Sequence, residues 1–81
     1  MDIKDTIEMM KSEDYKERFK AEFYQVKIRL EKLTDMIDKL SKGELNFEPK
    51  CSFELFCTQR DIMSAYCSIL RERAKIEDIQ L

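Results

Sequence analysis

Two polar residues interrupt an apolar helical stripe near the C-terminal end of the chain, and they are the first candidates for chemistry. Gln59 and Arg73 occupy stripe positions where an apolar side chain is normally favoured, and Tyr66 lies midway between them. In a helix bundle such groups can line a polar pocket at the centre or between subunits, where a guanidinium pairs with a phosphate or a carboxylate. The alternative is structural, because polar seam residues often fix helix pairing and an Arg near a helix end can extend its charge into solvent. Arg71 lies two positions before Arg73 and faces another direction, so the two do not form one fork.

A second group of candidates follows one flank of the long helical segment, where Lys20, Tyr24 and Lys27 recur at helical spacing. A ring outside the main apolar stripe can stack on a nucleobase while neighbouring cations meet its phosphates. The alternative is a solvated helix face, because interspersed acidic residues dilute the positive potential. The candidate ligand-binding residues are therefore Arg73, Gln59, Tyr24, Lys20, Lys27, Arg71 and Tyr66.

Composition removes most catalytic chemistry. The 81 residues include no His, which excludes imidazole bases and His-ligated metals, and one Gly, which excludes glycine-rich phosphate loops. The three cysteines, Cys51, Cys57 and Cys67, lack Cys-x-x-Cys spacing, so we expect reduced thiols that fill space in the fold. No carboxylate pair stands out as catalytic. We therefore expect no enzyme and no cofactor, and no ligand spacing favours a metal.

The charge is nearly balanced, with 15 basic and 17 acidic residues and a net charge of −2. Bulk electrostatics thus indicates neither a nucleic-acid-binding surface nor an acidic nucleic-acid mimic. The first residues are acidic where a signal peptide is basic, and no apolar run approaches the roughly 18 residues of a membrane span. We expect a cytoplasmic protein that binds neither membranes nor nucleic acid directly.

The scarcity of residues that break helices predicts an all-α fold, since the chain has one Gly and one Pro. We expect a single domain with a short helix over about 2–11, a long helix over about 13–42, a connector over 43–51 and a helix over about 52–77. Ser12 is the expected N-cap of the long helix, and Gly43 its expected end. The short connector predicts a long antiparallel helical hairpin.

The last helix carries two apolar rows. The row read as the seam is Leu55, Gln59, Ile62, Tyr66, Ile69, Arg73 and Ile76, and the row beside it is Phe56, Met63, Cys67, Leu70 and Ala74. One antiparallel neighbour cannot cover so wide an apolar arc. The N-terminal segment could cover part of it and a second subunit the rest. We therefore expect a homo-oligomeric helical bundle, in its simplest form a dimer that packs as a four-helix bundle.

Several segments of the chain match a known pattern. They are DYKERFKAEFYQVKIR over residues 14–29, FEPKC over 47–51 and ILRERAKIEDIQL over 69–81. With them the chain resembles a family of small crAss-phage-related helical proteins from tailed phages and prophages of gut bacteria. Ser52 stands where relatives often have Pro, and Phe23 replaces a common Tyr. The resemblance implies a phage accessory protein in the bacterial cytoplasm during infection, and it carries over no site residues.

Small helical phage accessory proteins often resemble counter-defence factors, which gives three functional hypotheses. The first is a sponge that binds a nucleotide-derived immune signal of the host in pockets between subunits and does not cleave it. The second is an inhibitor that binds a host defence protein such as a CRISPR effector. The third is a helical interaction protein with no immune role. Sequestration requires only affinity, which suits a chain without catalytic residue types.

Overall fold

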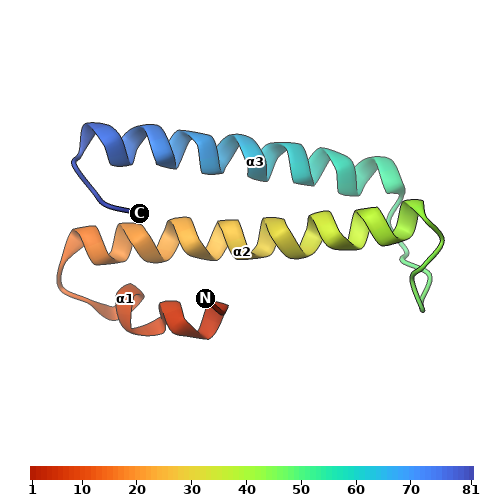
Figure 1. Ribbon diagram of the computed structural model, residues 1–81, viewed down its shortest axis with the longest axis horizontal. Coiled ribbons are helices and arrows are strands. Elements are labelled where there is room, and N and C mark those ends of the chain that lie inside the picture. The colour runs from red at the N-terminus through yellow and green to blue at the C-terminus, as the bar shows by residue number, and fades with distance from the viewer.

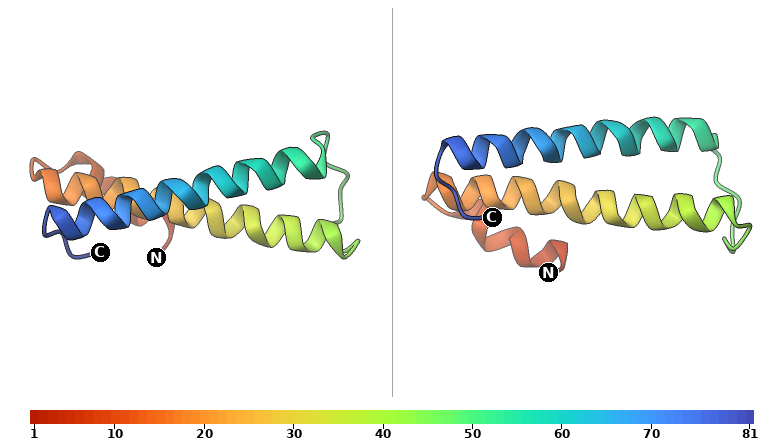
Figure 2. Two further views of the ribbon diagram at one scale, coloured as in Figure 1. Left: turned by 90° about the horizontal axis from the view of Figure 1, so that it is seen from above. Right: turned by 45° about the horizontal axis from the view of Figure 1, so that its top comes forward.

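The computed structural model describes residues 1–81 and contains only helices and their connections. A 3₁₀ turn, η1 (Ile3–Thr6), continues into α1 (Ile7–Lys11), and α2 (Tyr15–Ser41) and α3 (Phe53–Ile76) follow. This confirms the expected all-α fold. The two long helices lie side by side and antiparallel, and α1 lies on the side of α2 away from α3 (Figures 1 and 2). The molecule is elongated, with extents of 43 × 24 × 16 Å.

Side-chain caps determine where the long helices begin. Asp14 is the N-cap of α2 and accepts a hydrogen bond from the Lys16 backbone N–H at 3.0 Å. The expectation that Ser12 caps this helix was wrong, since Ser12 instead ends α1 and its hydroxyl accepts from the Asp14 N–H. The carboxylate of Asp14 also complements the positive end of the α2 dipole. Ser52 caps α3 through the Leu55 N–H at 3.1 Å.

Gly43 ends α2 in the left-handed conformation, with φ of 70°. The Glu44 N–H then reaches back to the Lys39 carbonyl oxygen at 2.8 Å, and the Gly43 N–H to that of Leu40 at 3.2 Å. This is the hydrogen-bond pattern of a Schellman motif, in which Gly meets no steric penalty. The chain leaves the helix abruptly here, and the connector brings α3 back along α2 (Figure 1).

The hydrophobic core lies between the first half of α2 and the second half of α3. Its buried residues are Phe19, Phe23, Cys67, Leu70, Ala74 and Ile79. The α3 row that packs on α2 is thus the one with Cys67, Leu70 and Ala74. The row with Ile62 and Ile69, interpreted from its spacing as the seam, faces solvent, so that interpretation was wrong. Spacing identifies apolar rows, but it does not say which of two rows meets the neighbouring helix.

The thiols differ in their surroundings. Cys67 is fully buried in the core, Cys57 is half-buried and Cys51 is exposed. Burial raises the pKa of the Cys67 thiol, because the low-dielectric core disfavours the thiolate. At this position the thiol behaves as a small apolar side chain.

The N-terminal segment packs on α2 alone. Buried Thr6 donates from its hydroxyl to the Ile3 carbonyl oxygen at 2.6 Å and accepts from the Gln25 amide at 2.9 Å. Both α1 and η1 contact α2, and neither contacts α3. The suggestion that this segment covers part of the last helix was therefore wrong, and the outer face of α3 stays open. None of the helices has both the length and the apolar content to cross a membrane.

Candidate functional site

A sharp turn at the end of α3 folds the C-terminal residues back across the hairpin. Asp78 adopts the left-handed conformation, with φ of 58°, and the Ile79 N–H donates to the Ala74 carbonyl oxygen at 2.8 Å. The Ile79 side chain is buried in the core, which supplies the apolar contact typical of a Schellman motif. Lys16 of α2 also donates to the Asp78 carbonyl oxygen at 3.1 Å. The tail is therefore held against α2.

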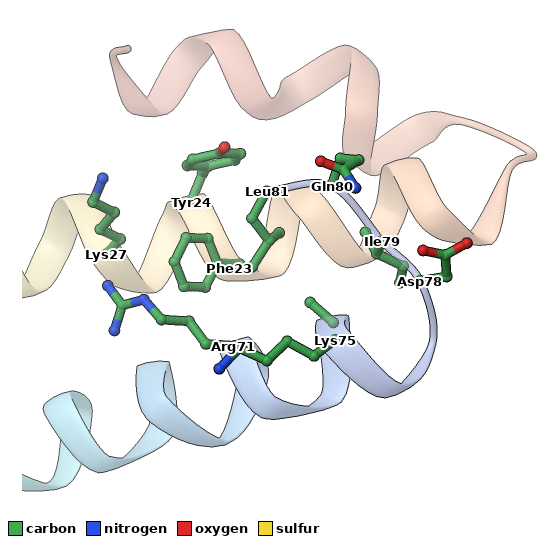
Figure 3. A pocket seen from close by; sticks show the side chains of 10 residues that line it. Phe23, Tyr24, Lys27, Arg71, Lys75, Asp78, Ile79, Gln80 and Leu81 are labelled. Carbon is green, nitrogen blue, oxygen red and sulfur yellow. The ribbon is translucent and has the colours of Figure 1, made fainter.

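The returning tail closes one end of a pocket between α2 and α3. The pocket has a volume of about 470 Å³, within the usual range for small-molecule sites. Figure 3 shows its walls, which come from α2, from the last turns of α3 and from the tail. The lining residues are Phe23, Tyr24, Lys27, Arg71, Ala74, Lys75, Asp78, Ile79, Gln80 and Leu81.

Aromatic rings and cations meet in this pocket, which we call the cationic pocket. The rings of Phe23 and Tyr24 pack edge to face, with centroids 5.3 Å apart and planes at 73°. The guanidinium carbon of Arg71 lies 5.2 Å from the Phe23 ring centroid, which is cation–π geometry. Lys27 and Lys75 reach the pocket from α2 and α3 respectively (Figure 3). The half-buried Tyr24 ring and the positive charge of the three basic residues thus lie within the reach of one small ligand, whereas the Phe23 ring is buried beneath Arg71.

The electrostatics of the cationic pocket differ from those of the whole chain. Three of its lining residues are basic and only Asp78 is acidic, although the chain carries a net charge of −2. Lys27 and Lys75 form ion pairs with carboxylates outside the pocket at 3.9 and 3.5 Å. Exposed pairs of this kind contribute little and exchange easily. Arg71 makes no ion pair, so its charge is available to an anion.

Two other hollows help to define the site. One of about 330 Å³ lies further along α2 and shares Lys27 and Arg71 with the cationic pocket. The two basic side chains therefore stand between adjoining spaces. Another, of about 620 Å³, lies at the connector end of the hairpin, and its lining includes Glu48 but no basic residue. It is larger, but its chemistry does not suit an anion.

Three of the residues selected from the sequence come together in the cationic pocket, namely Tyr24, Lys27 and Arg71. Arg73 does not join them. Its guanidinium lies over the Phe19 ring at 5.0 Å and donates to Glu77 at 3.2 Å and to the Tyr15 hydroxyl at 3.0 Å. Arg73 thus ties the start of α2 to the end of α3.

The remaining candidates also lie outside this pocket. Lys20 pairs with Glu17 at 3.2 Å, and the Tyr66 hydroxyl donates to Glu22. The Gln59 amide contacts the Met63 sulfur at 3.7 Å on the exposed side of α3. The polar groups of Lys20, Tyr66 and Gln59 are therefore bound to other residues of the chain.

Sequence reasoning missed several lining residues. Phe23 and Lys75 line the pocket but were not among the candidate residues, and the same is true of the tail residues. A signal for them existed, because an apolar residue five positions after Ala74, namely Ile79, fits the apolar contact of a Schellman motif.

The contact between Tyr15, Arg73 and Glu77 predicts a pH dependence. The Tyr15 hydroxyl donates to the Glu77 carboxylate at 2.6 Å, and this bond, together with the Arg73 guanidinium, lowers the pKa of Glu77 below its usual 4.5. The stabilisation by Glu77 is therefore present above pH 4.5 and is lost as the pH falls through the lowered pKa. We expect the difference in unfolding free energy between wild type and Glu77→Gln to be constant at neutral pH and to shrink in acid. Urea unfolding at a series of pH values measures it, and a difference that grows in acid would contradict the contact.

The fold and the pocket define a small all-α hairpin protein with a cationic, aromatic hollow beside its C-terminal turn. The chain belongs to the Sequestin family, whose model matches residues 13–76. The match spans α2, the connector and α3, and so includes the pocket residues that these two helices contribute. The family name suggests a sequestering role. No curated protein and no solved structure matches the chain.

Proposed function

We propose that this protein is a phage counter-defence factor that binds a nucleotide-derived immune signal of the host and holds it without cleaving it. The observation that carries the proposal is the cationic pocket, where Lys27, Arg71 and Lys75 surround two aromatic rings. A nucleotide offers the complementary groups, which are a flat base and anionic phosphates. The protein acts in the cytoplasm of the infected bacterium, and it acts as a homo-oligomer.

In this proposal each part of the ligand has a role. The base lies against the Tyr24 ring, because ring faces are tolerant stacking partners for any base. A phosphate lies near Arg71, whose planar guanidinium can donate two parallel hydrogen bonds to its oxygens. The adjoining hollow beyond Lys27 gives room for a second nucleotide unit. Cyclic oligonucleotides and ADP-ribose derivatives have this combination of groups.

The residue types that line the pocket support binding without cleavage. They include one carboxylate, that of Asp78, and no thiol. The basic residues supply charge to hold a phosphate, and the neighbouring aromatic residues exclude water from one side of it. We therefore expect the ligand to leave the protein chemically unchanged.

The test is depletion of a signal followed by its recovery. Purified protein is incubated with a panel of cyclic oligonucleotides and ADP-ribose derivatives and removed by ultrafiltration, and the filtrate is analysed by chromatography. We expect one signal to disappear from the filtrate and to return intact when the protein fraction is heated. A modified product would identify an enzyme instead, and a full panel left in the filtrate would reject the sponge.

A further inference from the structure

The outward face of α3 carries a stripe of four exposed aliphatic residues, beside which lie Gln59, Tyr66 and Arg73, and no element of the chain covers it. Leu55, Ile62, Ile69 and Ile76 are 57 to 83% exposed, and they recur at intervals of seven residues. In Figure 1 the order of the elements is α3, α2 and α1, so α3 has a neighbour on one side only. Side chains of this size offer several hundred Å² of apolar surface, the scale on which such patches mark interaction sites.

The spacing of the stripe specifies the kind of surface that fits it. A seven-residue repeat keeps one line of side chains facing a partner only when that partner is another helix. The length of the stripe, which spans 21 residue steps from Leu55 to Ile76, corresponds to about 32 Å of helix. The occupant must therefore be a helix of similar length with its own apolar row.

We propose that this stripe binds the same stripe of a second copy, with the two α3 helices antiparallel. The four aliphatic positions are symmetric about the midpoint between Ala65 and Tyr66. An antiparallel pair therefore places Leu55 against Ile76 of the second copy, and Ile62 against Ile69. One two-fold axis satisfies all of these contacts, as in the isologous interfaces of most dimers.

The charges of α3 favour the antiparallel direction. Its first half, 53–64, carries Glu54 and Asp61 on the side of the stripe, and its second half, 65–76, carries Glu72, Arg73 and Lys75 there. Arg60 and Arg71 lie on the opposite flank, away from a partner at the stripe. Without them the halves carry net charges of −2, from two acids, and +1, from two bases minus one acid. Antiparallel pairing places the acidic half against the basic half at both ends. Parallel pairing would place the two acidic halves together and align the helix dipoles unfavourably.

The interface leaves the cationic pocket accessible. Arg71, which lines the pocket, lies on the flank of α3 opposite to the stripe, with the buried row of Leu70 and Ala74 next to α2. The pairing therefore specifies the self-association in the proposed function and does not depend on the ligand. If the wild type binds no signal, the proposed function of the pocket is wrong. If the wild type is a monomer, the proposed pairing through the stripe is wrong.

Mass measurements test the pairing. We expect sedimentation equilibrium of the wild type at tens of micromolar to give twice the mass of the 9.8 kDa chain. Ile62→Glu places two carboxylates in the apolar seam and should halve the measured mass, with helix content by circular dichroism unchanged. Ile7→Glu alters an exposed aliphatic residue on α1, outside the stripe, and should keep the doubled mass. A wild-type monomer, or an assembly that Ile62→Glu leaves intact, would overturn the proposal.

Disulfide trapping tests the direction in a Cys51→Ser, Cys57→Ser background. Ala65 lies beside the two-fold axis, so Ala65→Cys should form a covalent dimer under mild oxidation. Leu55 lies at the end of the stripe, about 32 Å from the same residue of an antiparallel partner, so Leu55→Cys should stay monomeric on a denaturing gel. Efficient trapping through both positions would indicate parallel helices and overturn the antiparallel arrangement.

Discussion

Replacing Arg71 by Glu is expected to weaken binding of the sequestered signal by about a hundredfold or more. Arg71 lies 5.2 Å from the Phe23 ring centroid and has no carboxylate partner, so its charge is free to meet a phosphate. A hydrogen bond to a charged group contributes about 1.5–3 kcal/mol, and each tenfold change in affinity corresponds to about 1.4 kcal/mol. Charge reversal adds repulsion to the loss of that bond. Isothermal titration calorimetry with the signal identified by depletion measures the change.

The matched control is Arg60→Glu, which makes the same change of charge on the same helix. Arg60 pairs with Asp61 at 3.2 Å and lies outside the cationic pocket. We expect the Arg60→Glu variant to bind the signal with nearly the affinity of the wild type, apart from a small effect of net charge that added salt removes. An equal loss of affinity in the two variants would mean that the signal responds to overall charge and not to the pocket.

Replacing Leu70 by Ala is expected to lower the free energy of unfolding by about 2–5 kcal/mol. The Leu70 side chain is 1% exposed and packs in the core with residues of both long helices. Its truncation removes buried apolar surface and leaves a cavity that the hairpin cannot easily close. A domain of this length has a total stability of only about 4–12 kcal/mol, so the loss is a large share of it. Urea unfolding followed by circular dichroism measures the effect.

The adjacent residue gives the control, because Ile69 is 58% exposed and lies on the outward stripe. Ile69→Ala should leave the unfolding free energy of dilute protein nearly unchanged and should reduce only the stability that rises with protein concentration. Leu70→Ala should destabilise the protein at every concentration. If Ile69→Ala lowered the unfolding free energy in dilute solution more than Leu70→Ala, the assignment of the Leu70 row to the contact with α2 would be wrong.

Much of the fold follows from local sequence. The lack of residues that break helices, the cap at Ser52 and the left-handed turn at Gly43 specify two long helices joined by a short connector. Competition between neighbouring caps was harder to predict. Ser12 and Asp14 both suit a helix start, and the choice of Asp14 depends on how α1 ends and how the chain turns onto α2.

The candidate site was only partly predictable. Tyr24 and Lys27 were selected because they share a flank of one helix, and Arg71 because it lies two positions before Arg73. Their proximity depends on how α3 is rotated against α2, which no local pattern encodes. Arg73 fitted the sequence argument best, yet it binds Tyr15 and Glu77 and not the pocket. An Arg in an apolar row can bind groups on either side of that row, because its side chain is long enough to reach both.

The sequence by itself determined the helical class, the hairpin and the two apolar rows of the last helix, because backbone propensity and periodicity are local properties. The tertiary structure alone decided which row is buried. Phe19 and Phe23 of α2 pack with the row of Cys67, Leu70 and Ala74. The large rings of Phe19 and Phe23 fill the space beside the small side chains of Cys67 and Ala74, and which rows meet in this way depends on both helices together. That single choice turns Arg71 toward the aromatic pair and leaves the stripe of Ile62 and Ile69 open to a partner.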